Sequence, residues 1–88
     1  LAKLCGWYVY HTRDSRRSVA GYPDLTCVHL VWGVFWAELK MGQAKPTEAQ
    51  LDWMARLLAA NQRVYLWRPE DWPQIEAVLQ GREPQTNL

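Results

Sequence analysis

The sequence predicts an α/β fold, a small mixed sheet of about four strands with flanking helices. Residues 7–11, 24–30, 31–40 and 64–67 are rich in the β-branched and aromatic side chains that strands favour. Residues 47–60 and 69–80 carry apolar side chains at helical spacing. The expected order is (α)βββαβα. The strand–helix–strand unit within it predicts a parallel pair joined by a crossover.

Individual residues set the expected boundaries of these elements. Residues 1–4 are typical of a helix end closed by Gly6, and Gly33 marks the expected turn between the second and third strands. Thr47 and Gln50 form the pattern of a capping box at the start of the first long helix. The spacing predicts that this helix turns four residues toward the core: Leu51, Met54, Ala55 and Leu58.

Length and composition predict one domain and argue against several classes of protein. A chain of 88 residues holds one domain, here 1–81 followed by a tail at 82–88, and a net charge of +1 is not that of a protein that coats nucleic acid. The apolar runs predict no membrane span and no signal peptide. Cys5 and Cys27 lack metal spacing, so we expect reduced core thiols and a cytoplasmic location. The six tryptophans are expected to fill the core.

Acidic and basic side chains suited to catalysis are expected where the second strand begins and the third ends. Alternation places Glu38 and Lys40 on one face of the third strand, and a hairpin would bring Asp24 beside Glu38. Two carboxylates are a ligand set that Mg²⁺ accepts, with a backbone carbonyl such as that of Leu39 in support. Such an ion would polarise a phosphate oxygen and acidify a bound water. Lys40 would orient or deprotonate that water, or offset charge in the transition state.

Each of these residues also has a plain structural interpretation. Glu38 and Lys40 are equally consistent with an exposed ion pair at a strand end, which stabilises a fold very little. Gln50 is explained by its capping box alone. Glu70 and Asp71 form a second acidic pair, which is better explained by capping of the last helix.

The ordered set of motifs narrows these alternatives. The chain contains GYPDL at 21–25, ELK at 38–40, KPTEAQLDW at 45–53 and VYLWRPEDW at 64–72. Together they closely resemble the VRR-NUC domain, the virus-type replication-repair nuclease module of the PD-(D/E)xK superfamily. The resemblance runs from about residue 6 to residue 80, nearly the whole chain.

The resemblance implies a restriction-endonuclease-like fold and a DNA endonuclease that depends on Mg²⁺ or Mn²⁺. In that family the acids matched by Asp24 and Glu38 bind metal, the lysine matched by Lys40 serves the water, and a glutamine matches Gln50. The implied substrate is branched DNA, such as four-way junctions in bacterial or phage-infected cells, and the implied assembly is a homodimer. No small-molecule substrate or membrane is implied. Family members also carry an acid on a first helix, and residues 1–5 contain none, so this helix is expected to be truncated.

The segment before Asp24 supplies the predicted DNA contacts. Basic and hydroxyl side chains close to a metal suit phosphate groups, which position a duplex without reading its sequence. These residues are Arg13, Ser15, Arg16 and Arg17. The rival hypothesis is a module of the same fold that binds DNA or assembles with other proteins and has no productive metal site.

Overall fold

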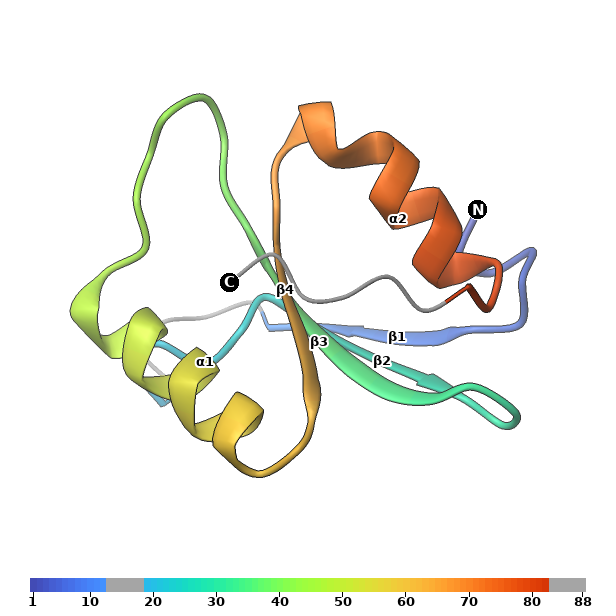
Figure 1. The fold of residues 1–88 in the computed structure, drawn as a ribbon, viewed down its shortest axis with the longest axis horizontal. Helices are drawn as coiled ribbons and strands as arrows, with labels where there is room; N and C mark the ends of the chain where they lie inside the picture. Colours follow the sequence, from blue (N-terminus) through green and yellow to red (C-terminus); the bar gives the residue numbers. More distant parts are fainter. Residues whose placement is uncertain (13–18, 83–88) are drawn as a thin grey trace.

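The fold is a small mixed α/β domain with one four-stranded sheet (Figure 1). This computed structural model describes residues 1–12 and 19–82. Its elements, in chain order, are β1 (Tyr8–His11), β2 (Leu25–His29), β3 (Gly33–Leu39), α1 (Glu48–Ala59), β4 (Arg63–Trp67), the short 3₁₀ helix η1 (Pro69–Asp71) and α2 (Trp72–Leu79). Within these described residues, no helix has the length and apolar character needed to cross a membrane.

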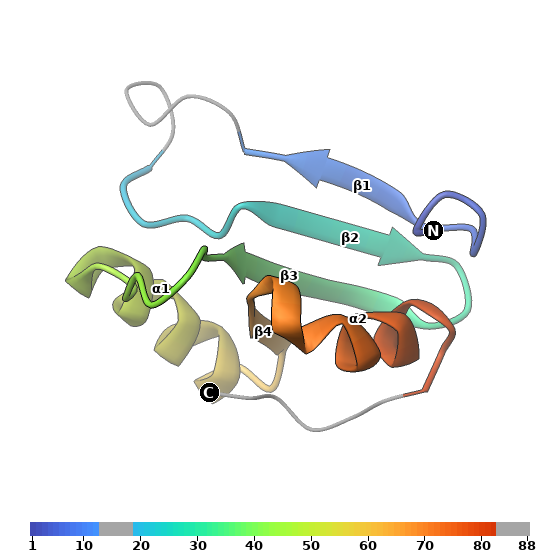
Figure 2. The same cartoon turned by 90° about the horizontal axis from the view of Figure 1, so that it is seen from above.

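The strands lie in the sheet in their order along the chain. β1 pairs with β2 and β2 with β3 in antiparallel fashion, whereas β3 and β4 are parallel and are joined through α1. The parallel crossover that the sequence predicted is therefore confirmed. The two helices lie on opposite sides of the sheet, as the two views at right angles show (Figures 1 and 2).

The larger hydrophobic core lies between the sheet and α2. Phe35 and Ala37 of β3 are completely buried there beside Tyr65 and Trp67 of β4, and Val78 and Leu79 of α2 close over them. The buried indole of Trp7 packs edge-on against Phe35 and donates a hydrogen bond of 2.9 Å to the Leu79 carbonyl. The predicted role of tryptophan in filling the core is confirmed for the two buried tryptophans, 7 and 67.

The opposite face of the sheet packs against α1. Val64 of β4 and Met54 of α1 are buried, and the ring of Tyr22 meets Trp53 of α1 edge-on, with centroids 5.1 Å apart. This layer also contains Glu38, because Glu38 alternates along β3 with the α2-facing Ala37. The candidate site therefore lies on the α1 side of the sheet.

Three details of the predicted elements are wrong. Residues 2–6 form hydrogen-bonded turns instead of a helix end, because so few residues do not repay the cost of nucleating a helix. The turn between β2 and β3 spans residues 30–32, and Gly33, at a φ of 85°, is already the first residue of β3.

On α1, Leu51 and Ala55 are exposed, and the side turned inward carries Gln50, Trp53, Met54, Leu57 and Leu58. The tail predicted at 82–88 lies almost entirely outside the described residues.

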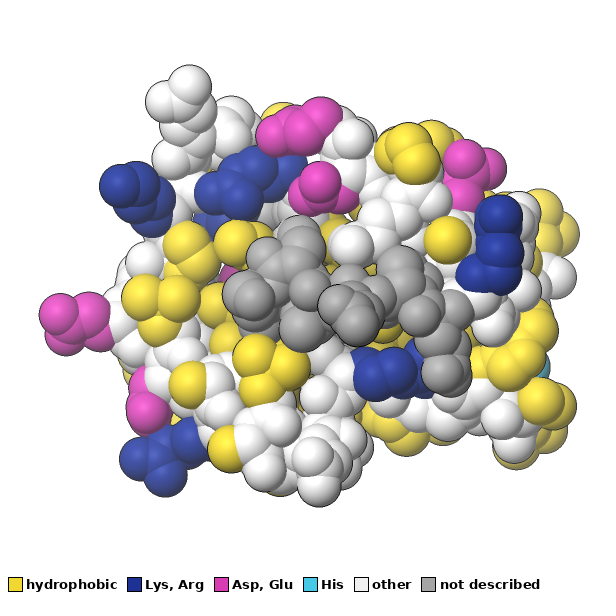
Figure 3. All heavy atoms as spheres, in the orientation of Figure 1, with side chains coloured by type: hydrophobic (Ala, Val, Ile, Leu, Met, Phe, Trp, Pro, Cys, Tyr) yellow, Lys and Arg dark blue, Asp and Glu magenta, His cyan; other side chains and the backbone are white. Residues whose placement is uncertain are grey.

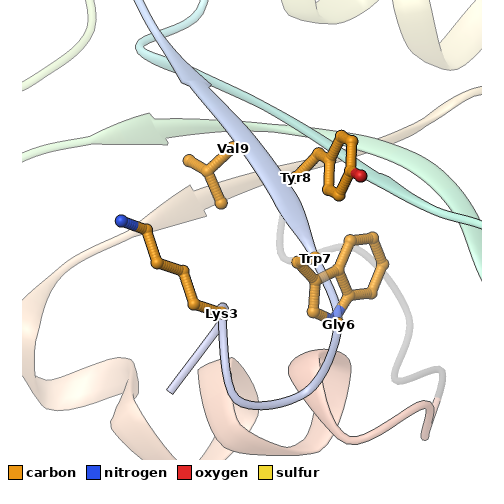
Figure 4. A pocket seen from close by; sticks show the side chains of 5 residues that line it. All are labelled: Lys3, Gly6, Trp7, Tyr8 and Val9. Atoms are coloured by element: carbon orange, nitrogen blue, oxygen red, sulfur yellow. The ribbon is translucent and has the colours of Figure 1, made fainter.

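One part of the sheet has no helix over it. All four residues of the edge strand β1 are exposed, and Tyr8 and Tyr10 share their face with Val28 of β2. Figure 4 shows Tyr8 and Val9 on opposite sides of β1, with Lys3 of the N-terminal turns beside Val9. We call Tyr8, Tyr10, Val28 and the fully exposed Leu30 the open apolar face.

Candidate metal centre

The site forms where three elements meet at one end of the sheet. The start of β2, the end of β3 and the start of α1 lie together there, at the left of Figure 2. The β2–β3 register pairs Thr26 with Trp36 and Leu25 with Ala37. Continued by one residue, this register places Asp24 opposite Glu38, as the strand alternation predicted.

Asp24 immediately precedes β2 and is half-buried. Its carboxylate oxygen Oδ2 accepts a hydrogen bond of 2.9 Å from the backbone N–H of Leu39. A strand residue points its N–H and its carbonyl toward the same neighbouring strand, so the Leu39 carbonyl faces the same gap. The Asp24 carboxylate and the Leu39 backbone therefore meet at the end of the β2–β3 pair.

Glu38 is the one buried charged residue of the described chain, with 1% of its surface exposed. Burial is the main cause of a rise in the pKa of its carboxyl group from 4.5 to about 8. The neighbouring Asp24 carboxyl contributes to this rise, and the positive charge of Lys40 opposes it. Among the described residues, Glu38 Oε2 has no hydrogen-bond partner. Glu38 is thus not the exposed ion pair of the plain interpretation.

Gln50 serves the helix cap and the site at once. Its backbone N–H donates to Thr47 Oγ1 at 3.2 Å, and its Oε1 accepts from the Thr47 N–H at 2.8 Å, which completes the predicted capping box. Its Nε2 donates a hydrogen bond of 3.3 Å to Glu38 Oε1. The amide group therefore ties the first turn of α1 to the buried carboxyl.

Lys40 is the first residue after β3. Its backbone N–H donates to the Trp67 carbonyl at 3.0 Å, which fixes its position at the end of the parallel pair. Its ammonium lies close enough to lower the pKa of Glu38. Lys40 also borders an apolar hollow between the ends of β3 and β4, where Trp67 and Ile75 form part of the lining.

These residues fit a hard divalent cation. Mg²⁺ and Mn²⁺ prefer oxygen ligands, and Mg²⁺ sites commonly use one or two carboxylates and keep several waters. The described residues contain no cluster of three or more acidic, histidine or cysteine side chains that could hold a metal ion. The Glu38 oxygen that lacks a hydrogen-bond partner is the observation that favours an ion, because buried polar atoms are seldom left without one.

The predicted DNA-contact residues Arg13, Ser15, Arg16 and Arg17 lie outside the described residues. Another basic group was missed by the sequence reasoning. The loop from β3 to α1 carries Lys45, and Arg68 donates hydrogen bonds to the Gly42 carbonyl at 3.1 Å and the Ala44 carbonyl at 2.6 Å of the same loop. Figure 3 shows Lys and Arg side chains in this part of the surface, at the upper left, with acidic side chains directly beside them. No sequence signal links Arg68 to a loop so far away in the chain.

Other polar side chains have structural roles. Asp71 Oδ2 accepts a hydrogen bond of 2.9 Å from the Arg68 N–H, the capping role predicted for that acid. His29 Nδ1 accepts from the N–H groups of Val31 and Trp32, so the proton is on Nε2, which contacts the Cys5 carbonyl at 2.9 Å. Both cysteines are free thiols, and burial raises the pKa of Cys27 to about 12. Neither histidine nor cysteine belongs to the site.

The sequence and the structure were compared with known proteins. No family model, no characterised protein and no solved structure matches this chain. The case for a function therefore rests on the chain's own residues.

Proposed function

We propose that the chain is a divalent-metal-dependent deoxyribonuclease with a restriction-endonuclease-like fold. The observation that carries this proposal is the buried Glu38, which lies opposite Asp24, is hydrogen-bonded by Gln50 and has one oxygen without a partner. A buried acid with a strongly raised pKa, in a group of polar residues at strand ends, is typical of functional sites.

Each residue has a distinct part in phosphodiester hydrolysis. Asp24 and Glu38, with the Leu39 carbonyl, would hold Mg²⁺ or Mn²⁺. The bound ion would supply Lewis-acid polarisation of a phosphate oxygen and lower the pKa of a water. Lys40 would orient the attacking water and offset negative charge that develops on the phosphate. Gln50 would keep the Glu38 carboxyl turned toward the metal.

Branched DNA, such as a four-way junction, is the proposed substrate. We infer that Lys45 of the β3–α1 loop and Arg68, whose guanidinium binds carbonyls of that loop, contact phosphates near the cleaved bond. Phosphate contacts of this kind predict cleavage that depends on DNA shape and salt more than on sequence.

Cleavage assays with labelled DNA test the proposal. Four-way junction, flap and plain duplex substrates are incubated with Mg²⁺, Mn²⁺ or EDTA. We expect metal-dependent cutting, strongest on branched DNA, that is lost in Asp24→Asn and Glu38→Gln. Glu70→Gln is the matched control, because it neutralises an exposed acid outside the site. Binding of junction DNA without any cutting, unchanged by Asp24→Asn, would support the rival module that lacks a productive metal site.

We also propose that two copies form the active assembly. The open apolar face supports this proposal, because exposed apolar patches on small proteins commonly mark interfaces. The face consists of tyrosine and aliphatic side chains, and Trp72 is the only tryptophan among the large exposed apolar residues described. Analytical ultracentrifugation of the native chain and of Tyr8→Lys checks this: we expect a dimer and a monomer respectively, and a native monomer contradicts it.

A further inference from the structure

The hydrogen bonding between β2 and β3 changes beside the candidate site, where a side chain replaces a backbone carbonyl as the acceptor. Leu25 pairs with Ala37, so a ladder continued by two residues would place Pro23 opposite Leu39. The Leu39 N–H would then donate to the Pro23 backbone. Instead it donates to the carboxylate of Asp24 at 2.9 Å. A side chain therefore occupies the place in the ladder that a backbone carbonyl would otherwise take.

Thr12 explains why the Pro23 carbonyl does not accept the hydrogen bond from Leu39. It follows β1, and its hydroxyl donates a hydrogen bond of 2.9 Å to the Pro23 carbonyl. Its backbone N–H donates a second hydrogen bond, of 2.8 Å, to the Asp24 carbonyl. Pro23 is fully buried and, as a proline, has no N–H, so its carbonyl is its one backbone hydrogen-bonding group. Thr12 satisfies that group from the β1 side, which takes it away from β3.

Tyr22 holds the same segment from its other end. Its hydroxyl accepts a hydrogen bond of 2.9 Å from Trp36 Nε1 of β3 and lies 3.3 Å from Thr26 Oγ1 of β2. The segment 22–24 is thus anchored to the sheet by Tyr22 and to β1 by Thr12.

We propose that Thr12 is a positioning residue of the metal centre. Its hydroxyl and amide draw the backbone of Pro23 and Asp24 toward β1, and the Asp24 carboxylate, in place of the backbone, meets Leu39 and faces Glu38. The connection to metal binding rests on the proposed function, whereas the effect of Thr12 on Asp24 is a property of the protein without metal.

The effect on Asp24 is tested first, without metal, by amide hydrogen exchange in NMR. Thr12→Val removes the hydroxyl at nearly constant volume, and we expect the Leu39 amide to exchange about tenfold faster. The Phe35 amide, in the middle of β3, reports any general loss of stability and should change little. Thr12→Ser retains the hydroxyl and should restore slow exchange at Leu39.

Metal affinity is the second readout. Mn²⁺ titrations followed by water proton relaxation should show about tenfold weaker binding by Thr12→Val and near-native binding by Thr12→Ser. If the native chain binds no Mn²⁺, the proposed function fails, and the exchange data alone decide whether Thr12 positions Asp24.

Two results would overturn the inference. One is unchanged Leu39 exchange in Thr12→Val; the other is an equal acceleration at Leu39 and Phe35, which indicates a purely structural role. If Thr12→Val does not fold, Thr12→Ala takes its place, because it removes the same hydroxyl without pressing a methyl group against the Pro23 carbonyl.

Discussion

The side-chain amide of Gln50 donates a 3.3 Å hydrogen bond to the buried carboxyl of Glu38, and thereby connects the cap of α1 to the acid of β3. The two roles of Gln50 can be separated, because Thr47 takes part in the cap and makes no described contact with Glu38. That separation gives the first prediction.

Gln50→Ala should weaken Mn²⁺ binding by about tenfold, the usual effect of removing a partner of a metal ligand. Thr47→Ala should lower the free energy of unfolding by about 1 kcal/mol and leave Mn²⁺ affinity unchanged. Urea denaturation and Mn²⁺ titration of both variants check this. Equal losses of affinity in the two variants would show that Gln50 acts through the helix alone.

The stability of the metal-free protein should depend on the charge state of Glu38. Its pKa rises from 4.5 in the unfolded chain to about 8 in the folded protein. Between these two pH values the folded state therefore keeps a proton that the unfolded state has released. The contribution of Glu38 to the free energy of unfolding is therefore fully present below pH 4.5. It is lost as the pH rises toward 8, by on the order of a few kcal/mol.

Glu38→Gln tests this dependence, because an amide of similar shape cannot titrate. Urea denaturation at pH 5 and pH 8 in EDTA should show a smaller fall in stability for Glu38→Gln than for the native chain. Glu70→Gln, at an exposed position, should behave like the native chain. A native stability profile retained in Glu38→Gln would mean that other groups cause the pH dependence.

Gly21 sets how closely α1 approaches the segment before Asp24. It has a φ of 84°, and a Cβ there would lie 2.4 Å from the backbone of Ala49. We expect Gly21→Ala to destabilise the fold by about 3 kcal/mol or more. Gly42→Ala is the matched control, since Gly42 has a φ of 55° with nothing within 4 Å, and should cost about 1 kcal/mol. Thermal denaturation distinguishes them, and equal losses would contradict the close contact with Ala49.

The two cysteines should differ in reactivity. Cys5 is half-buried, whereas Cys27 is 2% exposed and its pKa is raised to about 12 by burial. A thiol reagent at pH 8 should therefore modify one thiol quickly in the native protein and both in urea. In Cys5→Ser the fast reaction should disappear. A fast reaction that persists in Cys5→Ser would show that Cys27 is accessible.

The sequence predicted local geometry well where one strong rule applied. Strand alternation placed Asp24 beside Glu38, and the pattern of Thr47 and Gln50 correctly located the start of α1. The rotation of that helix was harder to predict. Apolar spacing favoured Leu51 as an inward residue, but α1 instead turns Gln50 and Trp53 to the sheet, where they meet Glu38 and Tyr22. Contacts with residues distant in the chain determine that rotation, and the spacing of apolar residues along the helix does not predict these contacts.

The part played by Thr12 could not be predicted for the same reason. In the sequence it marks the end of a strand. Its importance depends on the register that places it next to Pro23 and Asp24. The contact between Arg68 and the loop that carries Lys45 likewise joins segments that are far apart in the chain.

From the arrangement of the sheet we expect an order of folding. β1, β2 and β3 are antiparallel neighbours in chain order, whereas β4 joins β3 only after the chain has closed the crossover through α1. Contacts between distant parts of a chain form slowly because loop closure costs entropy. Asp24 and Glu38 are then expected to meet within the early antiparallel unit, while their carboxyl groups are still in water. The pKa of Glu38 should rise only in the last step, when α1 docks and brings Gln50 against it.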